Sequence, residues 1–163
     1  MAQQRILIVG GGAAGLTTAS QLLRARPDLA ISILEPAKDH WYQPGWTLVG
    51  AGVFSLEQTR RAEADLMPRG VTWIQEAATV LDPATATVRT DSGRTIPYDI
   101  LVVATGLRLC WEAIAGLPQA LGRGGVCSNY SRDHAAYTWE CIQAFRRSEE
   151  HTSELQSQFR ISY

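Results

Sequence analysis

The feature that most constrains this chain is an apolar segment that runs directly into a glycine-rich turn and then into a helix. Residues 5–9, RILIV, are a run of mostly branched apolar side chains, which is typical of a strand buried on both faces of a parallel sheet. From residue 13 to 26, apolar residues recur at helical spacing until Pro27. Residues 30–36, AISILEP, read as a second strand. A strand, a helix and a strand within about 30 residues predict a parallel pair joined by a right-handed crossover.

The turn between the first strand and the helix, GGGAAG, has the spacing G-x-G-x-x-G. Gly10 permits the tight turn, Gly12 lets the backbone approach a pyrophosphate, and Gly15 lets the helix pack on the strand. The free N–H groups and the positive end of the helix then face the phosphates. The alternative is a turn with a purely structural role, but its position between a strand and a helix favours dinucleotide binding.

Glu35 ends the second strand, twenty residues after Gly15. A dinucleotide-binding fold places a carboxylate at this point to accept both ribose hydroxyls of the adenosine half. An acid at this position also selects against a 2′-phosphate. We therefore interpret Glu35 as a ribose ligand rather than as a surface glutamate. The turn and Glu35 together do not distinguish NAD from FAD.

The rest of the chain continues the α/β pattern. Residues 55–58, SLEQ, have capping-box spacing, which predicts that a helix starts there. Residues 71–74, VTWI, read as a strand, and residues 79–96 alternate in short pieces broken by DPAT and DSG, which predicts a small antiparallel meander. Residues 98–106, YDILVVATG, read as a further buried strand that ends in a tight turn. A last helix is predicted over residues 133–145.

Composition excludes several classes of function. The net charge of −1 over 163 residues argues against a nucleic-acid partner, which would require a basic face. The three cysteines have neither a disulfide-scaffold nor a metal-ligand spacing, so no metal is expected. The N-terminal MAQQRILIVGGG does not fit a signal peptide, and no stretch reaches the ~18 apolar residues of a membrane span. We therefore expect no targeting signal, and a location in the cytoplasm or peripherally on the inner membrane.

Four strings carry a resemblance to a known family. The ATG that ends YDILVVATG resembles the signature of flavoproteins with two dinucleotide-binding domains, the pyridine-nucleotide-disulfide oxidoreductase superfamily. The segment EPAKDHWYQPGWTLVGAG closely resembles sulfide:quinone oxidoreductases, especially the branch that includes the mitochondrial enzyme. GLP at residues 116–118 and the later SNYSRDHAAYTWECIQAF match the same family in order and spacing. The resemblance covers residues 5–146.

The resemblance implies FAD as the cofactor. It also implies a fold of class α/β: a Rossmann-like FAD-binding domain, incomplete, with a parallel sheet, helices and a small antiparallel β-meander. The residues that it implies in FAD binding are Ala13 and Ala14 on the pyrophosphate turn, Gln43 of the W-Y-Q-P motif against FAD, Ala78 with backbone groups for the adenine, and Thr105 and Gly106 beside the flavin.

The cysteines are interpreted through the same resemblance. In this family sulfide attacks a cysteine disulfide beside the flavin, and a released thiolate then passes two electrons to the flavin. Cys127 falls where some members carry an additional redox cysteine, while the essential pair of the family is expected beyond the last residue of this sequence. Cys127 is therefore the catalytic candidate, with a structural role as the favoured alternative. Cys110 and Cys141 are expected to be small core or helix-face residues.

The function implied is FAD-dependent oxidation of sulfide, with electrons passed to a quinone and with peripheral membrane contact through the C-terminal part of such enzymes. Two alternatives remain, namely another two-dinucleotide-domain flavoprotein, such as an NADH:quinone dehydrogenase, and an inactive FAD-binding fragment. The loop around Gln43 argues against the first alternative. No motif indicates an oligomeric state.

The end of the chain differs in texture. Residues 147–157, RSEEHTSELQS, resemble the in-frame translation of a widely used sequencing-library adapter. We therefore expect residues 1–146 to be the N-terminal part of an FAD/NAD(P)-binding domain, and residues 147–163 to be a non-native tail. On this interpretation the chain is a fragment of a longer enzyme.

Overall fold

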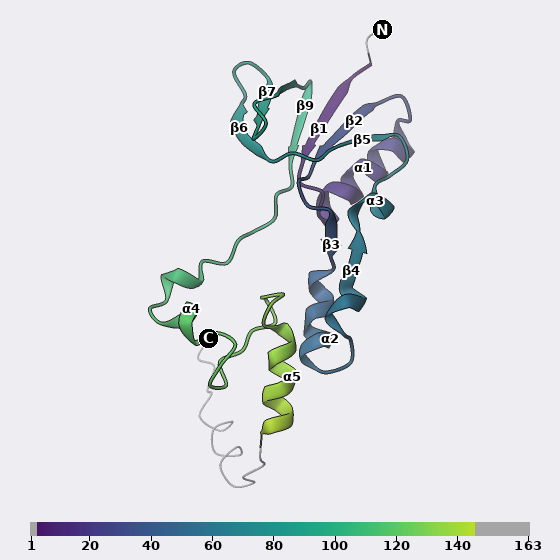
Figure 1. Cartoon of the computed structure of the whole chain (residues 1–163). Helices are drawn as coiled ribbons and strands as arrows, with labels where there is room; N and C mark the ends of the chain where they lie inside the picture. Colours follow the sequence, from purple (N-terminus) through teal and green to yellow (C-terminus); the bar gives the residue numbers. More distant parts are fainter. Residues whose placement is uncertain (1–2, 146–163) are drawn as a thin grey trace, which may run out of the picture. The chain divides into compact units, whose positions relative to one another are not determined.

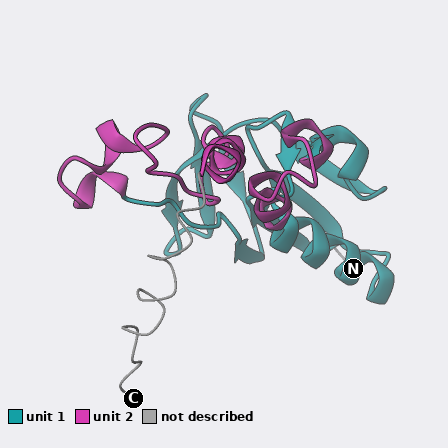
Figure 2. Ribbon diagram, turned by 90° about the horizontal axis from the view of Figure 1, so that it is seen from below, with its two compact units in different colours: residues 1–42, 60–110 teal, residues 43–59, 111–163 magenta. Residues whose placement is uncertain are grey.

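The computed structural model describes residues 3–145, so the predicted tail lies outside the described residues. The chain divides into two compact units (Figures 1 and 2). Among the described residues, the first unit comprises residues 3–42 and 60–110, and the second comprises residues 43–59 and 111–145. Each unit is described separately below.

The first unit is built on a parallel sheet of four strands in the order β5-β2-β1-β9. The register aligns Ile8 of β1 with Ile33 of β2 on one side and with Val102 of β9 on the other. The strands are β1 (Arg5–Val9), β2 (Ala30–Leu34), β5 (Val71–Ile74) and β9 (Ile100–Val103). The predicted Rossmann-like parallel sheet is thereby confirmed, and the first strand and residues 71–74 have the predicted bounds.

Helix α1 (Ala13–Ala25) covers one face of this sheet (Figure 1). It joins β1 to β2, which are parallel neighbours, as the predicted crossover requires. Side chains alternate between the two faces of a strand, so every second residue of β1 and β2 points toward the helix. The cluster on this face contains Ile6, Ile8, Ala19, Leu29, Ile31 and Ile33, all at most 6% exposed.

An antiparallel meander contributes to the cluster on the other face of the sheet. It consists of β6 (Ala78–Asp82), β7 (Thr87–Thr90) and β8 (Thr95–Pro97), as predicted from the two turn sequences. The cluster joins Leu7 and Val9 of β1 to Val88 of β7. Strand β1 is therefore buried on both faces, which explains its continuous apolar run.

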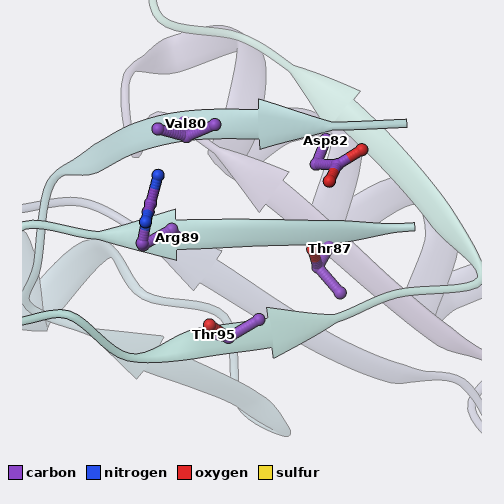
Figure 3. A pocket seen from close by; sticks show the side chains of 5 residues that line it. All are labelled: Val80, Asp82, Thr87, Arg89 and Thr95. Carbon is purple, nitrogen blue, oxygen red and sulfur yellow. The ribbon is translucent and has the colours of Figure 1, made fainter. Parts of the chain in front are cut away.

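The meander also has an outward face with a shallow hollow, lined by Val80, Asp82, Thr87, Arg89 and Thr95 (Figure 3). These residues belong to β6, β7 and β8, and none of them is a predicted site residue. The hollow is therefore a feature of the meander surface rather than of the glycine-rich turn.

A small two-stranded ribbon completes the first unit. Strand β3 (Asp39–Trp41) pairs antiparallel with β4 (Arg60–Ala62), and the short helix α3 (Glu63–Leu66) follows β4 directly. The prediction that a helix starts at Ser55 is therefore wrong beyond the first turn. Gln58 does accept a hydrogen bond from the Ser55 N–H at 2.7 Å, as in a capping box, but the turn is a 3-10 helix, η2 (Leu56–Thr59), and pairing with β3 then takes the chain into a strand.

The second unit is helical. Its α-helices are α2 (Trp46–Gly50), α4 (Leu117–Ala120) and α5 (Ala135–Ala144), and its 3-10 turns are η1 (Gln43–Gly45), η2 and η3 (Trp111–Ala113). A Cβ on Gly52 would lie against the Trp139 ring, and one on Gly50 against the Asn129 side chain. Two strings that carry the family resemblance therefore pack on each other within this unit.

None of the helices within residues 3–145 is long and apolar enough to cross a membrane. Among the same residues, no group of three or more histidine, cysteine, aspartate or glutamate side chains is arranged to hold a metal ion.

An ion pair between Arg5 and Asp99 joins the starts of β1 and β9. Asp99 accepts hydrogen bonds from the Arg5 backbone N–H at 2.7 Å and from its guanidinium at 2.7 Å, which lowers the pKa of Asp99 to about 2. Because the Asp99 pKa is lower in the folded state than its ordinary value of 3.8, the ionised carboxylate stabilises the fold at pH values above 3.8. This stabilisation is lost as the pH falls toward 2.

We therefore expect Asp99→Asn to lower the melting temperature at about pH 6, with the difference from the wild type closing between about pH 4 and pH 2. Thermal unfolding followed by circular dichroism across this range measures the effect. Asp65→Asn, at an exposed position on α3, is the control. A difference that stays constant down to pH 2 would contradict the assignment.

Candidate nucleotide-binding site

The predicted site residues of the first unit gather at the carboxyl edge of the parallel sheet. Three backbone hydrogen bonds continue the strand pairing there, from Ala104 to Val9 at 2.8 Å, from Gly10 to Leu34 at 2.8 Å and from Glu35 to Ile74 at 3.1 Å. The segments after β9, β1, β2 and β5 therefore lie in one row. In open α/β sheets, ligands bind at this carboxyl edge.

Gly10 and Gly15 have the close contacts that the G-x-G-x-x-G motif predicts. Gly10 has a φ of +107°, and a Cβ there would collide with the Ala104 carbonyl, whose carbon lies at 2.7 Å. A Cβ on Gly15 would collide with the Gly10 oxygen and would also meet the Ile8 side chain at 3.3 Å. Both positions therefore require glycine for packing within the protein.

Gly12 differs from the other two glycines. It is the N-cap of α1 with φ −65° and ψ −178°, which any residue can adopt, and a Cβ there would meet nothing within 4 Å. Gly12, Ala13 and Ala14 are all exposed. Helix α1 has no side-chain cap and no acidic residue in its first turn. The helix N-terminus is therefore open to an anion, as the predicted pyrophosphate turn requires.

Glu35 lies directly after β2 and is partly buried. Its Oε2 accepts a hydrogen bond from the Gly11 N–H at 2.8 Å, and its Oε1 accepts one from the Ala37 N–H at 2.8 Å. The Trp73 indole donates to the Glu35 carbonyl at 2.9 Å, which holds the backbone at this point. A carboxylate oxygen can accept more than one hydrogen bond, so both oxygens retain capacity for ribose hydroxyls.

The remaining predicted residues of this unit occupy the flanks of the same edge. Ala78 begins β6, soon after the end of β5, and is partly buried. Thr105 and Gly106 follow β9 and are exposed, and the Thr105 nitrogen lies 3.0 Å from the Cβ position of Gly10. The structure therefore brings the ATG segment against the glycine-rich turn.

Glu63 and His40, whose roles the sequence analysis missed, lie beneath the turn at Gly11. A Cβ on Gly11 would meet Glu63 Oε1 at 2.6 Å and Glu35 Cγ at 2.7 Å, so this position also requires glycine. Glu63 is 1% exposed, and its Oε2 lies 3.3 Å from Nδ1 of His40. The sequence shows Glu63 within the polar string RRAEAD, which gives no signal of burial.

The second unit holds the remaining candidates. Gln43 opens η1 and is exposed, so its contact with a flavin stays a prediction. Cys127 is exposed and lines a pocket with Cys141 of α5, and its redox role also stays a prediction. Cys141 is partly buried on a helix face, as expected. Cys110, in contrast, is exposed and lies before η3, so the expectation of a core or helix-face position is wrong for this residue.

The residues of the first unit fit FAD. The open space beside Gly12 admits a pyrophosphate, the uncapped N-terminus of α1 offers donors, and Glu35 supplies acceptors for the ribose. These features suit the ADP half that FAD shares with NAD, so they do not select between the two cofactors.

Comparison with known proteins selects between them. A sequence profile of the family described as pyridine nucleotide-disulphide oxidoreductase matches residues 4–139. The mitochondrial sulfide:quinone oxidoreductase of Dictyostelium discoideum is 46% identical over 145 residues, which cover 87% of this chain and 32% of that protein. The mitochondrial sulfide:quinone oxidoreductase of Mus musculus is 40% identical over 141 residues, which cover 86% of this chain and 31% of that protein.

A solved structure agrees with these matches. The X-ray structure of the sulfide:quinone oxidoreductase from the hyperthermophilic bacterium Aquifex aeolicus superposes with a TM-score of 0.66 at 28% identity, and the match covers 86% of this chain and 32% of that one. The chain therefore spans about a third of the length of the relatives it matches. The predicted resemblance to sulfide:quinone oxidoreductases is confirmed. The relatives of this chain are FAD-binding flavoproteins. The chain belongs to the pyridine nucleotide-disulphide oxidoreductase family.

Proposed function

We propose that this chain supplies the FAD-holding part of a sulfide:quinone oxidoreductase, which oxidises sulfide and passes the electrons through FAD to a quinone. The observation that carries the proposal is the row formed by the glycine-rich turn, Glu35 and the ATG segment at one sheet edge. The relatives named as sulfide:quinone oxidoreductases, at 46% and 40% identity, support this substrate class.

Different residues of the first unit bind different parts of FAD. The backbone from Gly10 to Ala14 and the N-terminus of α1 bind the pyrophosphate, because their N–H groups and dipole favour an anion. Glu35 accepts the ribose hydroxyls and excludes a 2′-phosphate. Ala78 offers backbone groups to the adenine, and Thr105 and Gly106 lie beside the flavin. FAD, when bound, supplies the two-electron chemistry.

The second unit contributes the remaining contacts. Gln43, exposed at the start of η1, contacts FAD, and the aromatic string around it builds the flavin-facing loop. Cys127 acts as a structural residue rather than as a redox residue. Because a quinone resides in the bilayer, we propose that the enzyme contacts the membrane peripherally, on the inner membrane.

The first test concerns Gly12. Gly12→Ala adds a methyl group into space that is open in the protein, at φ and ψ values that alanine adopts. Alanine restricts the unfolded chain more than glycine but is a poorer N-cap, so the stability of the unliganded chain should stay within about 1 kcal/mol of the wild type. The same methyl group occupies the space of the pyrophosphate, so FAD affinity should fall by at least about tenfold. Fluorescence titration with FAD and thermal unfolding measure the two effects. An unchanged affinity would mean that no phosphate approaches Gly12.

The second test concerns Glu35. Glu35→Gln removes the charge while keeping the shape, and the loss of a charge-assisted hydrogen bond costs roughly 1.5–3 kcal/mol, or about ten- to a hundredfold in FAD affinity. The control is Glu57→Gln, at an exposed position in η2 of the second unit. Retention of FAD after dialysis at the wild-type level would count against a ribose contact.

The third test concerns the reaction. A chimera that carries residues 4–139 of this chain in place of the matching segment of the Dictyostelium enzyme should reduce a soluble quinone with sulfide and not with NADH. In this chimera, Cys127→Ser should leave the rate of flavin reduction by sulfide within about twofold, as expected for a structural residue. Quinone reduction driven by NADH instead of sulfide would favour a dehydrogenase. A large loss of rate in Cys127→Ser with normal flavin content would establish a redox role.

A further inference from the structure

A buried glutamate–histidine pair lies beneath the glycine-rich turn, and the proposed function does not use it. Glu63 is the first residue of α3 and is 1% exposed, and its Oε2 lies 3.3 Å from Nδ1 of His40 on β3. Two constraints hold the pair together. The register of β3 and β4 places Asp39 opposite Ala62, and the Glu63 N–H donates to the Lys38 carbonyl at 2.9 Å.

The second carboxylate oxygen of Glu63 points toward the turn. Glu63 Oε1 lies 2.6 Å from the Cβ position of Gly11, and among the described residues it has no hydrogen-bond partner. Gly11 is the residue between the two motif glycines, Gly10 and Gly12. A negative charge on Glu63 would therefore lie directly beneath the backbone that receives the phosphates.

His40 connects the pair both to the turn and to solvent. It lines a cavity of about 440 Å³ together with Ala13, the first residue of α1, and with Thr17, Ser20 and Gln21 of the same helix. Its side chain is 14% exposed. The ring therefore has a route for proton exchange with water through a cavity that reaches the N-terminus of the helix.

The charges around the pair disfavour a second negative charge. Burial raises the pKa of Glu63, the His40 ring lowers it in part, and the charge of Glu35 raises it further. On the ribbon, Asp39 pairs with Arg60 at 2.9 Å, and Arg61 lies opposite His40. On α3, Asp65 is exposed, and the stretch of α1 that lines the cavity contributes no charged side chain.

We propose that Glu63 and His40 belong to the dinucleotide site as a counter-charge, which takes up a proton when a pyrophosphate binds at the turn. The inference rests on the proposed function, because it requires a dinucleotide at Gly10–Gly15. With one shared proton the pair has no net charge, and without it the pair has a charge of −1. A bound pyrophosphate brings two further negative charges, so it favours the protonated pair. Affinity for the dinucleotide therefore falls as the pH rises and the free pair loses its proton.

The experiment measures the affinity of the 163-residue chain for ADP-ribose between about pH 5.5 and pH 8.5 at constant ionic strength. Both phosphates of ADP-ribose are diesters and do not titrate in this range, and the probe lacks the flavin. The dissociation constant should rise at least about fivefold across the range, within the limit of tenfold per pH unit that one proton allows. An affinity that is constant, or that increases with pH, overturns the inference.

Variants assign the effect to the pair. Each of Glu63→Gln and His40→Gln leaves one titratable group and should reduce the slope, and the double variant should keep the dissociation constant within about twofold across the range. Asp65→Asn, on the same short helix, should retain the wild-type slope. A double variant that keeps the full slope while folding normally by circular dichroism overturns the assignment.

Calorimetry on the unmodified chain gives a result that depends on no variant. The enthalpy of ADP-ribose binding at about pH 7, measured in buffers of different ionisation enthalpy, should reveal uptake of a fraction of a proton. Zero uptake at every pH overturns the inference while leaving the proposed function intact. Absence of binding by both ADP-ribose and FAD overturns both.

Discussion

The close approach of Gly10 to the backbone of Ala104 is the contact on which the site depends. At φ +107° Gly10 turns the chain out of β1 and leaves no room for a Cβ beside the Ala104 carbonyl, and Gly15 leaves no room for a Cβ beside the Gly10 oxygen. A strand, a helix and a second strand therefore meet at residues without side chains. A Cβ at either glycine would push α1 or β9 away, and the N-terminus of the helix would no longer open at the sheet edge.

The sequence predicts the sheet well because its signals are local. The run at residues 5–9 and the string VTWI become β1 and β5 with the predicted bounds, and the two turn sequences separate the strands of the meander. The segment 55–66 was predicted poorly, because a genuine capping signal at Ser55 is followed by residues that pair with β3. Pairing with β3 overrides helical propensity there, and no local sequence pattern indicates this pairing.

The same limit applies to the site. Gly10, Gly12, Gly15 and Glu35 were found from spacing, since one β–α–β unit positions them all. Glu63 was missed because its spatial neighbours, Gly11 in the turn and Glu35 after β2, are distant from it along the chain, and the β3–β4 ribbon brings them together. The glycines of EPAKDHWYQPGWTLVGAG also have a packing role that the sequence did not show. Gly50 and Gly52 pack on Asn129 and Trp139, so the packing of α2 against α5 accounts for part of a pattern that resembles a cofactor loop.

Two carboxylates, Glu35 and Glu63, lie close to the phosphate-binding turn, and their hydrogen-bonding environments differ. The two carboxylate oxygens of Glu35 accept hydrogen bonds from two backbone N–H groups, at 2.8 Å each. The Oε1 of Glu63 has no such donor among the described residues, and burial raises the pKa of the group. In the site that we propose, the pair Glu63–His40 therefore provides the group whose charge adjusts. On this proposal, a single turn accepts the two negative charges of a pyrophosphate while the buried pair beneath it has no net charge.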